Sequence, residues 1–537
     1  MDTEWWRRAV VYQVYIRSFA DGNGDGTGDI EGLRSRLPYL SELGVDAIWL
    51  NPWYESPLCD GGYDVADHRR INPLFGTNEE AEEFIAEAHE LGLKVIADLV
   101  PNHTSDQHRW FGPAIESKPG HESRDRFHIL PGKSPDGAEP PNNWEARFGG
   151  PAWERLADGE WYLHIFDVTQ PDLNWNNPDV RDEFDSIIRF WLDIGVDGFR
   201  VDVAHGLIKH PEFRDYLDDE ERELGSYAED HPHWDRDELH EIVRGWRSIL
   251  DEYEGDRMLL AEAWVRPERL PLYVRPDEYN LSFSFEFATA PWDAQVFRSV
   301  ISKTLSEASS VDAPATWVLS NHDVVRHATR FGLPVGIKPP EWLLDGPHEA
   351  LDSAMGLRRA RAASLMMLAL PGTAYVYQGD ELGLPEVWDL DESVLEDPVW
   401  TLSGHSRKGR DGCRVPLPWD ETGPSFGFGA SGPWLPQPPW WGSMSVEAQE
   451  RDADSTLHLH RAAISIRNDF LRDDEVIEWL DFGPDAVAFR RGSGLVSITN
   501  LGPTPVEVGS AEIVLASASV DGGRIESDVT AWIRLAD

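Results

Sequence analysis

The sequence predicts an α/β chain built on a (β/α)8 TIM barrel, with a loop-rich domain inserted after strand 3 and a C-terminal antiparallel β domain. Three observations predict this fold. A unit of amphipathic helix, glycine and short apolar run occurs three times, eight apolar runs alternate with helix-length segments, and the pattern changes after about residue 475. Alternating strands and helices are typical of a parallel sheet, and eight such units favour a closed barrel.

The repeated unit is clearest in the first half of the chain. Helical periodicity over 33–44, 82–92 and 184–195 ends each time in a glycine, which can take the left-handed conformation that closes a helix. A continuous apolar run follows each glycine, as expected for a strand buried on both faces. An open doubly wound sheet is the alternative, but the first strand–helix turn has no G-x-G-x-x-G loop. The further strand-like runs are 10–16, 258–262, 281–285, 316–320 and 373–377.

The predicted strands are unevenly spaced at one place. The third ends near Val100 and the fourth begins near Val196, and the intervening Pro-, Gly- and Trp-rich segment is too long for an ordinary loop. After residue 475, short alternating runs between turns predict antiparallel strands. The predicted domains are the barrel over 1–103 and 172–474, with an irregular rim subdomain near 386–442, the inserted domain over 104–171 and the C-terminal β domain over 475–537.

Composition excludes some classes of partner. Among 537 residues, 96 Asp and Glu oppose 48 Lys and Arg, a net charge of −48, which disfavours binding to nucleic acid and to anionic membranes. The N-terminal MDTEWWRRAV has no apolar segment of the kind that marks a signal peptide, and no run of 18 apolar residues occurs. We therefore expect a cytoplasmic protein, either a monomer or a homodimer.

Charged residues stand where several predicted strands end, and the C-terminal ends of barrel strands are where active sites lie. Arg200 and Asp202 face the same side of a strand, so the guanidinium is expected to lower the pKa of the carboxyl and keep it ionised. Glu262 follows an apolar run, where desolvation is expected to raise its pKa. A carboxylate and a protonated acid at one mouth suit glycoside hydrolysis, although strand-end charges can also pair for stability alone. The residues expected there are Asp98, His103, Arg200, Asp202, Glu262, His322 and Asp323.

Several segments resemble a known family. DLVPNHTS, GFRVDVAHG, LLAEAW and VLSNHD look like the four signature regions of the α-amylase superfamily, glycoside hydrolase family 13. QPDLNW resembles a fifth region in its α-glucosidase and oligo-1,6-glucosidase form, and GGYDVADH and GDELGLPE match two further segments. The resemblance runs in order from about residue 5 to the C-terminus.

The resemblance implies a role for each matching residue. Asp202 would be the nucleophile, Glu262 the general acid and base, and Asp323 the stabiliser of the transition state. Asp64 and Arg410 resemble the pair that grips the non-reducing end of the substrate, with Arg407 and Arg414 as alternative partners. The product would keep its α-configuration, with the two catalytic carboxyls about 5–5.5 Å apart. The implied substrate-binding residues are Tyr63, Asp64, His103, Phe166, Arg200, His322 and Arg410.

The same segments bear on the substrate. The Asp–Arg pair and the QPDLNW form imply an exo-acting α-glucosidase on maltose and malto-oligosaccharides, with sucrose as a further candidate. Val203, which follows the nucleophile, leans towards α-1,6 linkages in the oligo-1,6-glucosidase pattern, whereas the AHG after it departs from that pattern. The alternatives are an oligo-1,6-glucosidase, a transglucosylase or sucrose isomerase, and a non-catalytic relative.

The stretch DGNGDGTGDIEG at 21–32 resembles a metal loop. As an EF-hand it fails, because Gly32 stands where the bidentate Glu belongs, a strand-like run precedes it, and no second loop occurs. It instead resembles the Ca²⁺ loop of the oligo-1,6-glucosidase group, where the ion would brace the loop after the first strand. The implied ligands are the side chains of Asp21, Asn23, Asp25 and Asp29 and the carbonyl of Thr27.

Overall fold

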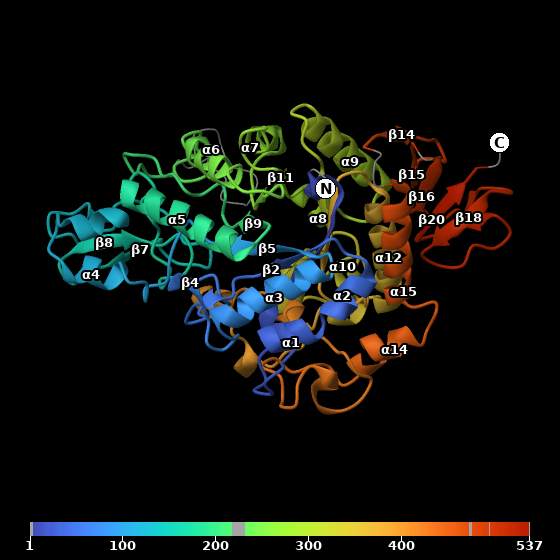
Figure 1. Ribbon diagram of the computed structural model, residues 1–537, viewed down its shortest axis with the longest axis horizontal. Coiled ribbons are helices and arrows are strands. Elements are labelled where there is room, and N and C mark those ends of the chain that lie inside the picture. Colours follow the sequence, from blue (N-terminus) through green and yellow to red (C-terminus); the bar gives the residue numbers. More distant parts are fainter. Residues whose placement is uncertain (1–3, 217–230, 472–474, 493, 536–537) are drawn as a thin grey trace.

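The computed structural model describes residues 4–216, 231–471, 475–492 and 494–535. Eight parallel strands form one sheet that curves into a nearly closed barrel, at the centre of Figure 1. All eight apolar runs predicted as strands are in it. Their order around the barrel is β11 (Leu281–Ser282), β10 (Met258–Ala261), β9 (Gly198–Val201), β5 (Lys94–Leu99), β2 (Ala47–Leu50), β1 (Val10–Val14), β13 (Thr373–Tyr377) and β12 (Thr316–Val318).

Alternate residues of each strand enter different cores. Val11, Trp49 and Ile96 belong to a cluster inside the barrel, whereas Val10 and Tyr12 belong to the large core between the strands and the outer helices. This alternation follows from the two-residue period of a strand. Both faces are therefore buried, which explains why the strands are continuous apolar runs in the sequence.

The three predicted helices begin and end for local reasons. The helix predicted over 33–44 is two helices, α1 (Ile30–Ser35) and α2 (Leu37–Leu43), and α2 starts with a proline in its first turn. Helix α3 (Asn78–Glu90) begins with a capping box between Thr77 and Glu80. Helix α5 (Pro178–Ile194) is preceded by Asn177, whose side chain accepts from the amide of residue 179. Glycines with positive φ follow all three units.

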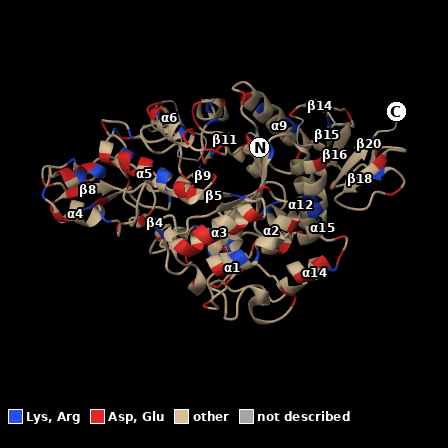
Figure 2. Cartoon of the chain, viewed as in Figure 1, with Lys and Arg blue, Asp and Glu red and all other residues tan. Residues whose placement is uncertain are grey.

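The remaining helices of the barrel and its rim range from four residues in α7 and α10 to 17 residues in α12. Acidic residues, red in Figure 2, occur on helices α3 and α5, in keeping with the negative charge of the chain. The bounds are α6 (Leu239–Leu250), α7 (Leu270–Tyr273), α8 (Phe285–Thr289), α9 (Ala294–Ser309), α10 (His327–Arg330), α11 (Pro339–Asp345), α12 (Ser353–Ala369), α13 (Pro398–Leu402), α14 (Val446–Glu450) and α15 (Thr456–Ile466).

The chain leaves the barrel between β5 and β9. A loop-rich domain there, at the left of Figure 1, contains α4 (Phe111–Glu116) and a three-stranded antiparallel sheet of β6 (Ile129–Pro131), β8 (Glu160–Leu163) and β7 (Trp153–Arg155). A hairpin of β3 (Tyr54–Glu55) and β4 (Asp67–Ile71) lies between β2 and α3. The exact domain boundaries drawn from the sequence stay a prediction.

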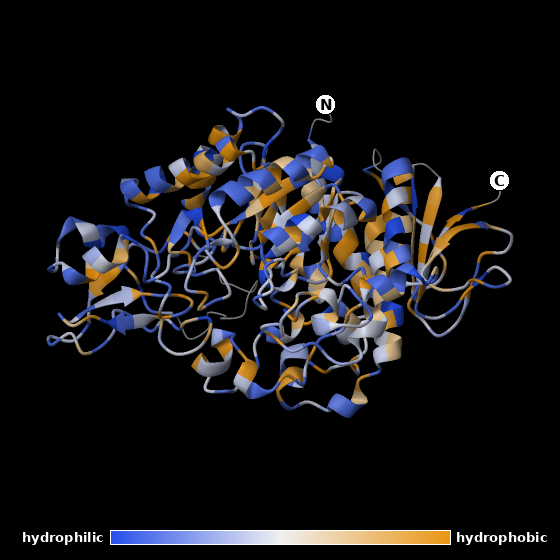
Figure 3. Cartoon of the chain, turned by 60° about the horizontal axis from the view of Figure 1, so that its bottom comes forward, coloured by the Kyte–Doolittle hydropathy of each residue, from blue (hydrophilic) through white to orange (hydrophobic). Residues whose placement is uncertain are grey.

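The C-terminal segment forms the predicted antiparallel sheet. Its strands, largely orange in Figure 3, pack against α12. Among the described residues, no helix is both long enough and apolar enough to cross a membrane. The strand order is β14 (Ile477–Trp479), β15 (Ala486–Arg491), β16 (Leu495–Asn500), β20 (Val529–Arg534) and β18 (Glu512–Ala516), with a separate pair of β17 (Val506–Glu507) and β19 (Arg524–Ile525).

Candidate active site

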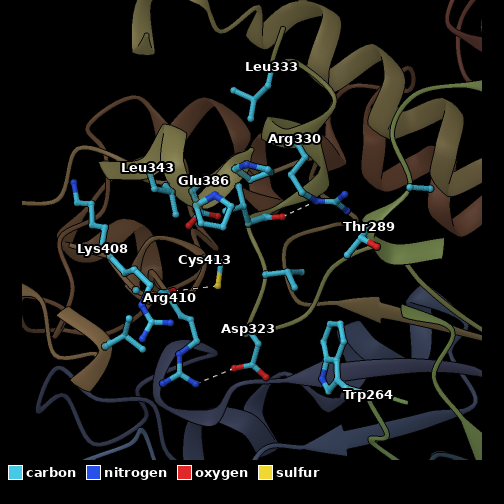
Figure 4. Close-up of a pocket in the computed structure, with 18 of the residues that line it drawn as sticks. Trp264, Thr289, Asp323, Arg330, Leu333, Leu343, Glu386, Lys408, Arg410 and Cys413 are labelled. Atoms are coloured by element: carbon cyan, nitrogen blue, oxygen red, sulfur yellow. Dashed lines mark hydrogen bonds and ion pairs between the residues drawn. The ribbon is translucent and has the colours of Figure 1, made fainter. Parts of the chain in front are cut away.

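The carboxyl ends of the barrel strands bring the predicted polar residues together. Asp98 lies beside Arg200 in the register of β5 and β9, and Glu262 follows the neighbouring β10. A cavity of about 870 Å³ opens at this mouth, and Figure 4 shows Asp323 and Arg410 joined across one part of it. The predicted residues that line the cavity are Tyr63, His103, Phe166, Asp202, Glu262, Asp323 and Arg410.

Arg200 lies beneath the cavity and holds its carboxyl groups in place. Its side chain is 1% exposed, and Nη1 donates to Asp98 Oδ1 at 3.0 Å and to Asp202 Oδ1 at 2.5 Å. Nη2 is 3.7 Å from Glu262 Oε2. One guanidinium therefore contacts both predicted catalytic carboxyls, which fixes their positions relative to each other.

Burial dominates the electrostatics of these carboxyls. It raises the pKa of Glu262 to about 8, against Arg200 and with the help of the Asp202 charge. It also raises the pKa of Asp202, although Arg200 and His103 oppose the shift. The predicted depression of the Asp202 pKa is therefore wrong, because the sequence shows the neighbouring Arg200 but not how completely the pair is buried. The raised pKa predicted for Glu262 agrees with the structure.

Two further donors orient Glu262. The backbone amide of Val203 donates to Oε2 at 2.8 Å, and the indole Nε1 of Trp264 donates to Oε1 at 2.5 Å. Val203 has φ 46°, a left-handed conformation that is strained for a β-branched residue. Backbone strain of this kind persists where the surroundings hold it, here beside the carboxyl that receives the amide.

Asp323 is the third carboxyl of the cavity. Burial raises its pKa, but the adjacent His322 and the guanidiniums of Arg410 and Arg414 outweigh burial and hold the pKa below its ordinary value. Its Oδ1 accepts from Arg410 at 3.1 Å and from Arg414 at 3.2 Å, whereas Arg407 donates to a backbone carbonyl in the inserted domain. Asp323 therefore stays ionised beside the two groups whose pKa values are raised.

Aromatic side chains form one wall of the site. Tyr63 stacks on His322 with ring centroids 5.3 Å apart, and its hydroxyl donates to Asp98. His103 and Phe166 lie on the cavity 5.2 Å apart. Burial lowers the pKa of His103, so this imidazole is neutral at pH 7. Its Nε2 lies 3.2 Å from the carbonyl oxygen of Tyr63 and 3.1 Å from the amide nitrogen of Gln170, contacts that hold the ring at the cavity.

The predicted pair of Asp64 with Arg410 is wrong. Asp64 is fully buried, and its carboxylate accepts from the Ser56 hydroxyl at 2.9 Å and from the amides of Cys59 and Asp60 at 2.8 and 3.1 Å. These bonds satisfy the carboxylate within its own turn. Asp64 therefore supports the loop between β3 and β4 instead of contacting the substrate.

Asp60 takes the place that was predicted for Asp64. Arg410 Nη2 donates to Asp60 Oδ1 at 2.6 Å, while Nε of the same side chain donates to Asp397 at 2.6 Å and Nη1 to Asp323 at 3.1 Å. Asp60 and Arg410 both line the cavity, so their ion pair forms part of its wall. Arg410 is the partner among the three candidate arginines, as expected.

Replacing each of the two aspartates by Asn in turn distinguishes a role in substrate binding from a role in stability. We expect Asp60→Asn to lower kcat/KM for an α-glucoside by about 10- to 100-fold, since the bond to a charged partner is weakened. Asp64→Asn is expected to lower the free energy of unfolding by about 1–3 kcal/mol, because an amide replaces a buried acceptor of three donors. Steady-state kinetics and thermal unfolding of both variants measure this. A larger effect of Asp64→Asn on KM than of Asp60→Asn would contradict the assignment.

Sequence reasoning missed three residues of the site. Asp60 and Asp397 both bind Arg410, and Trp264 bonds to Glu262. Asp60 lies four residues before Asp64 in the same acidic, glycine-containing turn, so the turn could have been read with either carboxylate as the partner. Trp264 stands two residues after Glu262, and this spacing was the one signal in the sequence that could have indicated their contact. Asp397 had no local signal.

The predicted calcium loop is ordered by its own hydrogen bonds. Asp21 accepts from the amides of residues 24–26, and Asp29 accepts from the loop amides of residues 22 and 23 and caps α1 through the amide of residue 32. The side chains of Asn23 and Asp25 each accept from the amide two residues ahead. The oxygen donors suit Ca²⁺ chemically. Among the residues that the structure describes, no three His, Cys, Asp or Glu side chains are grouped as a metal site requires.

A carboxylate held against a buried guanidinium can attack, and a second carboxyl with a pKa of about 8 can deliver a proton at neutral pH. Two carboxyls at the mouth of a barrel, one that attacks and one that delivers the proton, define the chemistry of a retaining glycoside hydrolase. The chain belongs to the α-amylase family, glycoside hydrolase family 13, because the α-amylase catalytic domain matches residues 13–474. The family predicted from the signature segments is confirmed, and the protein is an enzyme of its α-glucosidase and oligo-1,6-glucosidase group.

Relatives of known name extend over most of the chain. A probable α-glucosidase of Rhizobium meliloti is 36% identical over 523 residues, covering 92% of this chain and 88% of the relative. An oligo-1,6-glucosidase of Parageobacillus thermoglucosidasius is also 36% identical, covering 87% and 84%. Among solved structures, the α-glucosyl transfer enzyme XgtA has a TM-score of 0.86 at 33% identity, covering 99% and 100%. The trehalulose synthase MutB from Pseudomonas mesoacidophila has a TM-score of 0.84 at 29% identity, covering 99% and 100%.

Proposed function

We propose that the enzyme is a retaining, exo-acting α-glucosidase that releases α-glucose from the non-reducing end of short α-glucosides such as maltose. The carrying observation is the ion pair of Arg410 with Asp60 in the cavity wall, within reach of Asp323. A charged wall beside the catalytic carboxyls suits a single terminal glucose better than a long chain that passes through. The names of the relatives support the same activity.

The mechanism follows from the positions of Asp202 and Glu262. Glu262 donates its proton to the glycosidic oxygen while Asp202 attacks the anomeric carbon, which gives a β-glucosyl ester and a free alcohol. Glu262, now a carboxylate, takes a proton from water, and the water oxygen displaces Asp202. Asp323 is ionised beside the cavity and stabilises the positive charge that develops on the sugar. Two inversions leave the glucose in the α-configuration.

The anomeric form of the first product tests this proposal. Proton NMR during hydrolysis of 4-nitrophenyl α-D-glucopyranoside, which releases only one glucose, is expected to show α-glucose before mutarotation, and malto-oligosaccharides are expected to lose one glucose at a time. Immediate appearance of β-glucose, or of internal fragments from long dextrins, would contradict the proposal.

The proposal also covers the glycosidic linkage that is cleaved and the molecule that accepts the glucosyl group. We assign α-1,4-linked substrates, with an oligo-1,6-glucosidase or a transglucosylase as the alternative that the names of relatives and structural neighbours favour. A product-resolved panel of maltose, isomaltose and sucrose distinguishes these, since transfer and isomerisation give new disaccharides and hydrolysis does not. The cytoplasmic location and the monomer or homodimer expected from the sequence stay predictions.

We further propose that the loop at 21–29 binds a structural Ca²⁺ through Asp21, Asn23, Asp25, Asp29 and the Thr27 carbonyl. The support is the set of oxygen donors and the position of the loop. Its amide at residue 21 bonds to Phe428 and its carbonyl at residue 26 accepts from Trp434, so the loop joins the first barrel strand to the rim.

A chelator is therefore expected to lower the melting temperature by several degrees while it changes turnover at moderate temperature less than about twofold, because none of residues 21–29 lines the cavity. Thermal unfolding with and without EDTA, and with added Ca²⁺ or Mg²⁺, measures this. A loss of activity without a loss of stability, or no effect on either, would count against the calcium proposal. An Asp25→Ala variant should no longer respond to Ca²⁺.

A further inference from the structure

The cavity continues well beyond the catalytic carboxyls. Its second part lies between the junction of α8 and α9 (residues 289–296) and the segment that runs from β12 into α11 (residues 324–343). Figure 4 shows Leu333, Leu343 and Thr289 around this part, all above Asp323 in the view. We call the group Val324, Val325, Leu333, Val335, Ile337 and Leu343 the apolar half of the cavity.

The position of Glu262 indicates which part of a substrate would lie in the apolar half of the cavity. The general acid protonates the oxygen that joins glucose to its leaving group, so the leaving group extends from this carboxyl away from the glucose-binding residues. The Trp264 indole bonds to Glu262 Oε1 and lines the cavity with a flat face, while it stacks on Phe285 with ring centroids 3.7 Å apart. The path from Glu262 past Trp264 therefore leads the leaving group towards the apolar half.

Polar side chains near this path are already hydrogen-bonded within the protein. Arg330 donates to the backbone carbonyls of residues 325 and 319, at 2.9 and 2.6 Å. Arg359 donates to Asp528 at 3.0 Å, and Thr289 donates to the carbonyl of residue 285 at 2.9 Å. The carboxylate of Asp293 caps α9. A second sugar would need donors and acceptors for its several hydroxyls, and desolvating those hydroxyls without partners is costly.

The apolar side chains at the entrance point to the same chemistry. Val335 is fully exposed at the tip of the loop, next to the half-buried Ile337, and both line the cavity. These two side chains continue the apolar lining of the cavity to its mouth, where an apolar group can enter. The glucose side differs, because it is lined by Asp60, His103 and Arg410.

We propose that the apolar half binds an alkyl or aryl group, so that the enzyme acts on α-glucosides of apolar alcohols in preference to disaccharides. This inference rests on the proposed α-glucosidase activity and names its leaving-group class. In the forward reaction, the bond from the anomeric carbon to the alcohol oxygen breaks and Glu262 supplies the proton of the released alcohol. In transfer, an apolar alcohol gives its proton to Glu262, its oxygen bonds to the anomeric carbon, and the ester to Asp202 breaks.

A chain-length series tests the proposal. Methyl, butyl and hexyl α-D-glucopyranosides have leaving alcohols of similar acidity, so that their kcat/KM values report contacts of the chain. We expect kcat/KM to rise by about two- to fourfold for each added methylene, the change expected when a methylene leaves water for an apolar site. Hexyl glucoside is then expected to exceed maltose. If kcat/KM does not change with chain length and maltose is cleaved efficiently, this inference alone is overturned. If neither maltose nor any alkyl glucoside is cleaved, the proposed α-glucosidase function is overturned.

Two variants assign the chain-length effect to the apolar half. Val335→Asn changes a fully exposed loop residue, and Val324→Thr replaces a methyl by a hydroxyl of similar size at a half-buried position. Both are expected to lower the ratio of kcat/KM for hexyl over methyl glucoside by about two- to fourfold. The matched control is Val476→Asn, the same exchange at an exposed valine of the C-terminal domain, and it should leave the ratio as it is. An unchanged ratio in both cavity variants overturns the proposal.

Discussion

Replacing Asp202 by Asn is expected to lower kcat for maltose by about 10⁴- to 10⁶-fold, the range found when an enzyme loses its nucleophile or the group that activates it. An amide does not form the glucosyl ester, and Glu262, the other cavity carboxyl near Arg200, is 3.7 Å from the guanidinium and serves as the acid. The fold is expected to persist, because Arg200 keeps its bond to Asp98 at 3.0 Å. The exposed Asp182→Asn on α5 is the matched control and should retain full activity.

Azide makes the test specific to the nucleophile. In Asp202→Ala the small anion can occupy the space of the lost carboxylate and displace an activated leaving group such as 4-nitrophenol in one step. One displacement inverts the anomeric centre, so the expected product is β-glucosyl azide. Recovery of α-glucosyl azide, or turnover of Asp202→Asn above one-hundredth of the parent, would assign the attack to another residue.

Much of the barrel could be predicted because its strands are buried on both faces. β1, β2 and β9 are fully buried along their lengths, so each is a short apolar run between polar segments. The single helix predicted over 33–44 is two helices, because Pro38 lies in the first turn of the second one and cannot donate to the preceding turn. Apolar periodicity continues across such a break and does not reveal it.

The position of a site residue on a strand decided whether the sequence revealed it. Asp98 and Arg200 stand in register on neighbouring strands, so the topology places them together once the barrel is known. Asp60 and Arg410 are 350 residues apart and both lie outside the barrel strands, so their bond depends on how two loops meet. The choice between Asp60 and Asp64 could not be made without that geometry.

Electrostatics was the least predictable part of the site. The sequence places Arg200 two residues from Asp202, which by itself would lower the pKa of the carboxyl. The structure adds burial of the whole group and a second acid, Asp98, on the same guanidinium, and burial raises the pKa of Asp98 to about 7. Charged groups that act on Asp202 come from β5, β9 and the end of β10, and only its pair with Arg200 is local in the sequence.

Glu262→Gln is expected to lower kcat/KM for maltose by about 10²- to 10⁴-fold, the usual contribution of general acid catalysis. The first step on 4-nitrophenyl α-glucoside should be nearly unaffected, because 4-nitrophenolate leaves without a proton. Azide is then expected to attack the β-glucosyl ester on Asp202, and this second inversion gives α-glucosyl azide, the opposite anomer to that from Asp202→Ala. Equal losses on maltose and on the nitrophenyl substrate would contradict the role of Glu262 as the acid.

The pH dependence of activity and of stability gives a second test of Glu262. Burial raises its pKa from 4.5 to about 8, so the acid is protonated below that value, and kcat/KM of the parent should fall as pH rises through about 8. The folded state binds this proton more tightly than the unfolded state, so the stability due to Glu262 is complete below pH 4.5 and is lost as pH rises to about 8. Glu262→Gln cannot ionise, and we therefore expect it to melt higher than the parent at pH 9 but not at pH 4. Glu512→Gln, on the exposed start of β18, is the matched control, and a variant whose advantage is the same at both pH values would show that Glu262 does not carry the raised pKa.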